Sequence, residues 1–144
     1  MSWPRRTKVA IIGSGFAGAA TAYHLAKRGY QDLVVLDRES TVGVHASGRN
    51  AALCRQLCED PTTTDLAVAG ARFLREHAGE LGETALVRQT GSVLLSSDPR
   101  ALTALERAAH RSHVETRTLS AQEVAEAWPE LAPTTGLSVP QDGV

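Results

Sequence analysis

The chain has 144 residues, and its 42% hydrophobic and 22% charged content is ordinary for one globular domain. A formal net charge of −1 gives no overall attraction to nucleic acid, and no stretch approaches the roughly 20 apolar residues of a transmembrane helix. Two cysteines exclude a disulfide framework, and no signal-peptide pattern opens the chain, so we expect a cytoplasmic protein without a metal site.

The first elements alternate between strand and helix patterns. Residues 8–12 and 33–36 are short apolar runs typical of buried parallel strands. Between them, residues 16–28 are rich in Ala and Leu and predict a helix that ends at Gly29. A helix between two parallel strands predicts a right-handed βαβ unit.

The rest of the chain predicts further helices and strands. After a polar loop we expect a helix over 50–57, which would place Cys54 and Cys58 on one face. Asp-Pro pairs at 60–61 and 98–99 each predict a helix start, and Ser120 to Glu123 is a capping-box pattern. The expected helices cover 61–77, 99–110 and about 121–128, and the expected strands cover 86–88, 92–95, 114–119 and 136–140.

A GxGxxG motif stands between the first strand and the first helix. Gly13 allows a tight turn, Gly15 leaves room for a pyrophosphate, and Gly18 lets helix and strand pack closely. Asp37 follows at the end of the second strand, where a carboxylate binds adenosine ribose hydroxyls and repels a 2′-phosphate. The motif predicts a dinucleotide site but leaves both FAD and NAD open.

The segment after Asp37 resembles the D-amino-acid-oxidase-type superfamily of FAD-dependent oxidoreductases, which includes glycine oxidase, sarcosine oxidase and D-amino-acid dehydrogenases. Its stretch Gly-Val-His-Ala-Ser-Gly-Arg-Asn-Ala-Ala at 43–52 is most similar to the D-arginine dehydrogenase branch, and the resemblance continues at 91–95, 120–131 and 139–143. The resemblance implies FAD and an α/β fold: a Rossmann-like FAD-binding βαβ with a parallel sheet, followed by the beginning of an α+β substrate domain. Residues 1–85 would begin the FAD-binding domain, 86–139 would be a partial substrate domain, and 140–144 would start the return to the FAD domain.

The same resemblance implies the site residues. Ser47 to Asn50 would begin a helix whose amino end faces the FAD phosphates. His45 would lie near the flavin as a catalytic residue, as in the D-arginine dehydrogenase branch, or carry the flavin covalently, as in the dimethylglycine dehydrogenase branch; an ordinary loop histidine is the third alternative. The predicted cofactor-binding residues are Gly13, Ser14, Gly15, Phe16, Ala17, Gly18, Asp37, Arg38, His45, Ala46, Ser47, Gly48, Arg49, Asn50 and Ala51.

The implied reaction is oxidation of the C–N bond of an amino acid or related amine by hydride transfer to flavin. Family members hold the substrate with an Arg and a Tyr from later in the chain, so we expect a truncated, inactive amino-terminal portion or one subunit of a split enzyme that needs a complementary chain. The alternatives are a non-catalytic FAD-binding fragment, a 2-hydroxy acid or glycerol 3-phosphate dehydrogenase of the same fold, and an NAD-binding domain.

Overall fold

The computed structural model describes residues 5–82, 84–131 and 134–144. The chain forms two compact units that divide between Ala51 and Ala52, and each is described by itself. This division separates the predicted cofactor residues from the remainder of the chain. The functional boundaries expected near residues 85 and 139 stay predictions.

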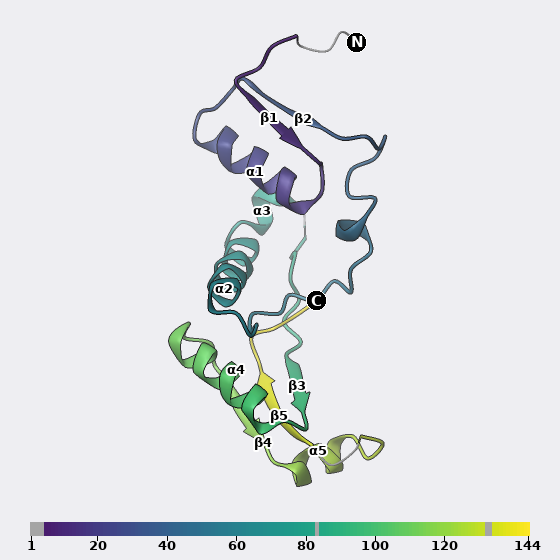
Figure 1. The fold of residues 1–144 in the computed structure, drawn as a ribbon, viewed down its shortest axis with the longest axis vertical. Helices are drawn as coiled ribbons and strands as arrows, with labels where there is room; N and C mark the ends of the chain where they lie inside the picture. Colours follow the sequence, from purple (N-terminus) through teal and green to yellow (C-terminus); the bar gives the residue numbers. More distant parts are fainter. Residues whose placement is uncertain (1–4, 83, 132–133) are drawn as a thin grey trace. The chain divides into compact units, whose positions relative to one another are not determined.

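The first unit is the predicted βαβ (Figure 1). Strands β1 (Val9–Ile12) and β2 (Leu33–Leu36) pair in parallel, with Val9 opposite Leu33 and Ile12 opposite Leu36. Helix α1 (Phe16–Lys27) connects them and packs against both strands. Gly29 has a φ of +88°, which a residue with a side chain rarely adopts, so it ends α1 as expected. The α/β fold class is confirmed.

The helix expected over 50–57 is wrong. Residues 51–58 contain no helix; Ala52 has a φ of +53°, which interrupts a right-handed helix, and Cys54 pairs as an isolated bridge with Gly143. The Cys54 N–H donates to Gly143 O at 2.8 Å, and the Gln56 N–H donates to the Asp142 carboxylate at 3.0 Å. These long-range hydrogen bonds satisfy the backbone in place of a helix, so Cys54 and Cys58 share no helical face.

The second unit is built on an antiparallel sheet. Its strands are β3 (Ser92–Ser96), β4 (Arg117–Leu119) and β5 (Thr135–Val139), in the order β3-β5-β4. The strand expected over 114–119 is shorter than predicted, and the strand expected over 86–88 is wrong. There the chain forms only a bridge between Gln89 and Gly143, because the segment pairs with three carboxyl-terminal residues and not with a full strand.

Local capping signals place the helices of this unit. The helices are α2 (Pro61–Glu76), α3 (Ala78–Leu81), α4 (Pro99–Arg111) and α5 (Ala121–Ala127). Asp60 accepts from the Thr63 N–H at the start of α2, and Asp98 caps α4 in the same way. The capping box of Ser120 and Glu123 at α5 is present with both of its hydrogen bonds.

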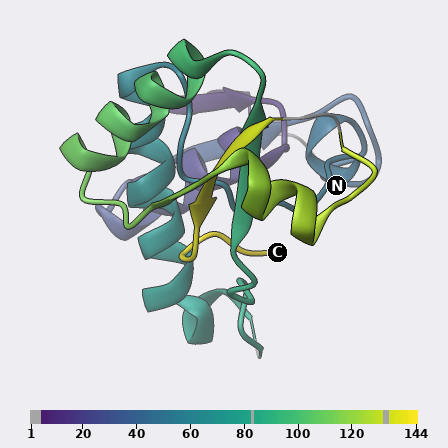
Figure 2. The ribbon, with the colours of Figure 1, turned by 90° about the horizontal axis from the view of Figure 1, so that it is seen from below.

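The hydrophobic core lies in the second unit, where α4 packs against β3 and β5 (Figure 2). Fully buried Leu57 and Leu137 are at its centre. On α2 the buried residues are Thr64 and Ala71, whereas Leu66 is 69% exposed. The core cluster comprises Leu57, Leu102, Ala109, Val114, Leu137 and Val139, with Val68, Leu94 and Leu105 packed against it.

No helix in the described part of the chain is long and apolar enough to cross a membrane.

Candidate cofactor site

The glycine loop between β1 and α1 is shaped by close backbone approaches. Gly13 donates its N–H to Leu36 O at 2.7 Å and has a φ of +100°, in the region that favours glycine. A Cβ added to Gly18 would overlap the carbonyl oxygen of Gly13. Any side chain at position 18 would therefore force the loop and the helix apart.

The amino terminus of α1 already holds an oxygen at the position expected for a phosphate. The N–H of Phe16, in the first turn, donates to Ser47 Oγ at 3.0 Å. A Cβ at Gly15 would come within 2.8 Å of that same oxygen. Since the first N–H groups of a helix lack partners within the helix and carry partial positive charge, this end suits a pyrophosphate.

A second glycine pair repeats the geometry of the first. Gly43, like Gly13, has a positive φ, and five residues later a Cβ on Gly48 would overlap the Gly43 carbonyl, as one on Gly18 overlaps Gly13. Gly43 was not among the predicted site residues. Gly43 could have been found from the sequence, because Gly43 and Gly48 are five residues apart, as Gly13 and Gly18 are.

The helix expected to begin at Ser47–Asn50 is wrong. The segment makes a single 3₁₀ turn, Ala46–Gly48, and the Asn50 side chain donates to Ser47 O at 2.5 Å. The segment therefore lacks the regular α-helix that we expected, and its role in binding the FAD phosphates stays a prediction. The Ser47 hydroxyl accepts from the Phe16 N–H at the start of α1.

Asp37 joins the end of β2 to the glycine loop. Its Oδ2 accepts from both the N–H and the hydroxyl of Ser14 at 2.6 Å, and its Oδ1 accepts from the Glu39 N–H at 3.0 Å. The Ser14 hydroxyl, the Glu39 N–H and the Ser14 N–H hold the pKa of the Asp37 carboxyl well below its usual range. These hydrogen bonds keep the carboxylate charged, and a charged carboxylate accepts strongly from hydroxyl donors such as those of ribose.

His45 belongs to a cluster with two charged neighbours. Its Nε2 lies 2.9 Å from Glu39 Oε1 and 3.2 Å from a terminal nitrogen of Arg38, whose Nε also donates to Glu39 Oε1 at 3.0 Å. One ring nitrogen cannot donate to the carboxylate and accept from the guanidinium at once, so the shorter contact favours a proton on Nε2. Arg38 thus contacts Glu39 through its Nε only, and its exposed side chain keeps terminal N–H donors available.

The described residues of this unit enclose a hollow of about 50 Å³. Predicted residues and residues missed by the sequence analysis line it together. Glu39 was missed because an acidic residue in a polar loop carries no distinctive spacing. The predicted lining residues are Gly15, Asp37, His45, Ala46 and Ser47, and the missed ones are Glu39, Thr41, Gly43 and Val44. Arg49, Asn50 and Ala51 do not line it.

The comparison with protein families decides the cofactor. A family model described as FAD dependent oxidoreductase matches residues 8–144. The chain belongs to this family. Its cofactor is therefore FAD, and the alternative of an NAD-binding domain is set aside. The tight Gly13–Gly18 turn, the oxygen already bound at the α1 terminus and the charged Asp37 fit the ADP half of FAD.

The chain is similar to two curated proteins and to one solved structure. It is 28% identical, over 98% of its length, to the mitochondrial pyruvate dehydrogenase phosphatase regulatory subunit of Mus musculus. It is 31% identical, over 67% of its length, to the mitochondrial dimethylglycine dehydrogenase of Homo sapiens. The crystal structure of glycine oxidase from Geobacillus kaustophilus matches 97% of the chain with a TM-score of 0.72 and 25% identity. The chain spans 17% and 11% of the two curated relatives and 40% of the glycine oxidase chain.

Proposed function

We propose that the chain is the amino-terminal part of an FAD-dependent enzyme that oxidises the C–N bond of an amino acid or related amine. The observation that carries the proposal is the glycine cradle at Gly13–Gly18, in a chain that the FAD-dependent family model matches from residue 8 to residue 144. The similarity to two proteins named for amino-acid substrates, dimethylglycine dehydrogenase and glycine oxidase, supports an amino-acid substrate.

In this proposal the first unit holds the ADP half of FAD. The pyrophosphate accepts from the first N–H groups of α1, where it takes the place of the Ser47 hydroxyl at Phe16. Asp37 accepts from a ribose hydroxyl, which takes the place of the Ser14 hydroxyl. The remaining predicted residues of the loop, including Arg38 and Ala51, border this site.

Bound FAD supplies a hydride acceptor. The substrate loses a hydride from the carbon that bears nitrogen and a proton from the nitrogen, and water hydrolyses the resulting imine to a carbonyl compound and an amine. The protein has to hold the substrate carbon in line for this transfer. In the family resemblance this task belongs to residues beyond those of this chain, so a whole protein or a complementary chain is part of the proposal.

We infer that His45 lies beside the flavin in the complete site. The contact of its Nε2 with Glu39 leaves Nδ1 as the ring nitrogen that can accept a proton. A covalent link to the flavin is the competing form of this role. Acid precipitation after FAD loading separates the two: colour in the pellet that disappears in His45→Ala indicates a covalent link, and colour that stays in the supernatant excludes it.

The Asp37→Asn variant tests the cofactor site. Replacing a charged acceptor removes a hydrogen bond worth about 1.5–3 kcal/mol, so the dissociation constant for FAD should rise roughly 10- to 100-fold. Asp32→Asn is the matched control, because Asp32 precedes the same strand and its carboxylate accepts from the Thr7 hydroxyl, outside the glycine loop. Equal FAD affinity in the wild type and Asp37→Asn would remove Asp37 from the site.

The reaction is tested by anaerobic mixing of the whole FAD-loaded protein with amine substrates. Loss of the visible flavin absorption with an amino acid or N-methyl amino acid supports the proposal. Loss of absorption only with a 2-hydroxy acid or with glycerol 3-phosphate would overturn the amine assignment in favour of a dehydrogenase of those substrates.

A non-catalytic role is the second candidate. The chain is similar over 98% of its length to a protein named as a regulatory subunit, and this similarity favours a module that binds FAD or a partner without oxidising a substrate. FAD that binds tightly and is reduced by none of the amines, hydroxy acids or glycerol 3-phosphate would support this candidate over the enzyme.

We also propose a cytoplasmic location. The free thiols of Cys54 and Cys58 suit a reducing compartment. Cell fractionation followed by thiol labelling of the denatured protein checks this, and recovery from a membrane-enclosed oxidising compartment would contradict it.

A further inference from the structure

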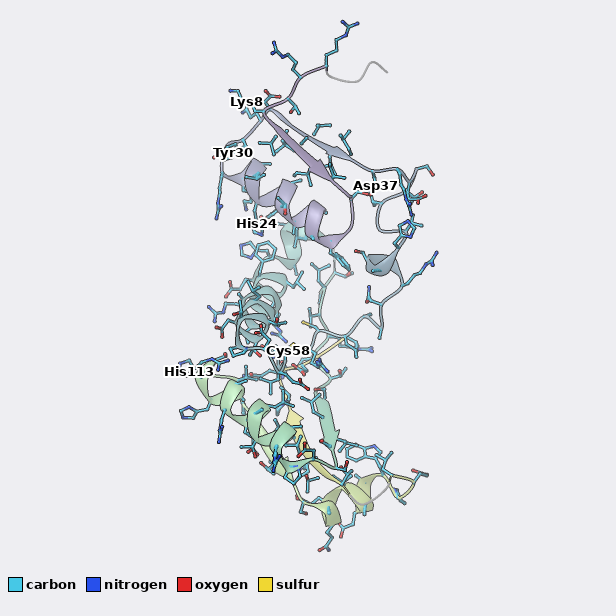
Figure 3. The ribbon with its side chains drawn as sticks, viewed as in Figure 1. Lys8, His24, Tyr30, Asp37, Cys58 and His113 are labelled. Atoms are coloured by element: carbon cyan, nitrogen blue, oxygen red, sulfur yellow. The ribbon has the colours of Figure 1, made fainter. Side chains whose placement is uncertain are left out.

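An open cavity of about 410 Å³, lined by both polar and apolar side chains, lies within the second unit. It is bordered by α2, by the residues that follow α4 and by the segment after β5. Figure 3 labels His113, which lies beyond the carboxyl end of α4 and lines this cavity. The lining includes none of the predicted cofactor residues between 13 and 51. Its volume lies within the roughly 300–1,000 Å³ of small-molecule sites.

Two arginines supply positive charge to one side of the cavity. Arg72 and Arg75 are three residues apart on α2, so their side chains leave the same face of the helix. The Arg75 guanidinium donates to Gln141 O, which holds its position. Arg72 makes no hydrogen bond or ion pair with any residue that the structure describes. Glu76 is the only acidic residue in the lining, which leaves one positive charge in excess when His113 is neutral.

Gln56 supplies a fixed hydrogen-bond acceptor in the wall of the cavity. The residue is only 4% exposed, and its Nε2 donates to Asp142 Oδ1 at 3.2 Å. Its Oε1 has no partner among the described residues. Because Gln56 lines the cavity and its Nε2 is held by Asp142, its Oε1 is the acceptor that the side-chain amide has left for a ligand.

We propose that this cavity binds a small molecule of free amino acid chemistry, with a carboxylate and an ammonium group. The planar guanidinium of Arg72 or Arg75 pairs with the carboxylate through two parallel hydrogen bonds. Gln56 Oε1 and the Glu76 carboxylate accept from the ammonium group. A cavity with cations and acceptors on its walls selects a zwitterion over an ion of either sign, because each alternative leaves part of the lining unpaired.

An NMR titration with L-alanine tests the site without any FAD present. The side-chain signals of Gln56 and Arg72 should shift in a saturable way, while acetate and methylamine, each with one of the two groups, should bind at least about tenfold more weakly. Arg72→Gln should weaken L-alanine binding roughly 10- to 100-fold, as expected for a lost charged hydrogen bond. Arg107→Gln is the control, since Arg107 lies on exposed α4 surface outside the lining, and it should bind normally.

Three results would overturn the proposal. They are the absence of saturable shifts with L-alanine, unchanged binding in Arg72→Gln, and equal shifts with inorganic phosphate, which would make the cavity a general anion site. Dispersed amide spectra of both variants establish that they fold. Because the titration involves no flavin, failure of the proposed oxidoreductase function leaves its outcome unaffected.

Discussion

The two compact units of the chain differ in what stabilises them. In Ala52–Val144, apolar side chains such as Leu57, Leu137 and Val139 are completely buried. Between residues 5 and 51 no described residue is buried, and Ile12 and Phe16 are 89% and 72% exposed. Parallel sheets are normally covered on both faces, whereas within the first unit α1 is the helix that packs against β1 and β2.

The unit that a sequence motif identifies is therefore not the unit that contains the hydrophobic core. The cofactor unit owes its shape to glycine sterics, which a sequence motif records well, and to hydrogen bonds within residues 5–51, such as those of Ser14 with Asp37 and of Phe16 with Ser47. The second unit owes its shape to a shared core and to long-range pairing, which no short motif records. Substitutions should therefore act on cofactor binding in one unit and on unfolding in the other.

The largest effect is expected from truncating the core. Leu137→Ala should lower the free energy of unfolding of the second unit by about 2–5 kcal/mol, because the side chain is fully buried and leaves a cavity. Leu66→Ala is the matched control: Leu66 is 69% exposed and should change stability by less than about 0.5 kcal/mol. Urea unfolding followed by circular dichroism measures both. Equal losses in the two variants would mean that residues 52–144 have no core of their own.

A somewhat smaller effect is expected in the glycine cradle. Gly18→Ala places a methyl group on the Gly13 carbonyl, and overpacking of this kind costs about 1–3 kcal/mol. The dissociation constant for FAD should rise roughly 5- to 150-fold, with the unfolding of the second unit unchanged.

Gly70→Ala is the control for Gly18→Ala. A Cβ at Gly70, inside α2, meets no atom within 4 Å, so this variant should bind FAD normally and gain about 0.5–1 kcal/mol in helix stability. A loss of FAD affinity in both variants would show that substitutions in the second unit also affect cofactor binding, against the expectation.

A gain of about 1 kcal/mol is expected from His113→Gly. His113 has a φ of +55°, and the Val114 N–H donates to Ala109 O across it, as in the turn that ends many helices with glycine. Glycine removes the strain of the left-handed conformation. Thermal unfolding should move upward, whereas His110→Gly, inside α4, should move it downward. A downward shift in His113→Gly would mean that its side-chain contacts outweigh the strain.

The smallest effect is a pH dependence carried by Glu123. Hydrogen bonds from the Ser120 N–H, the Arg117 guanidinium and the Ser120 hydroxyl lower the pKa of its carboxyl from 4.5 to about 2. A lowered folded-state pKa contributes stability that is complete above pH 4.5 and lost as the pH falls toward about 2. In Glu123→Gln the unfolding midpoint should depend less on pH over this range than in the wild type. In Glu126→Gln, on the same helix, the pH dependence should stay as in the wild type. Parallel curves for all three proteins would refute the assignment.

Sequence patterns predicted the elements whose causes are local. Asp60, Asp98 and Ser120 each begin a helix where the sequence placed one, and the GxGxxG turn has the expected backbone. Each of these features depends on residues within about five positions of one another, so a linear motif contains the cause.

The errors lie where distant residues decide the conformation. The 50–57 segment looked helical by composition, but Cys54 and Gln56 bond to residues more than eighty positions away. The same carboxyl-terminal residues replaced the strand expected over 86–88 by one bridge at Gln89. In the cofactor site, Glu39 was missed because its contact with His45 depends on how the loop folds back.

The hydrogen bonds of the Asp142 carboxylate determine how early the second unit can fold during synthesis. It binds Gln56, 86 positions earlier, and Ser92, 50 positions earlier. At about 5–20 residues per second, a ribosome needs roughly 4–17 s to travel from Gln56 to Asp142. The Ser47–Phe16 contact, in contrast, spans 31 positions and can close in roughly 2–6 s. The contact between Phe16 and Ser47 can thus form before Asp142, the partner of Gln56, has been synthesised.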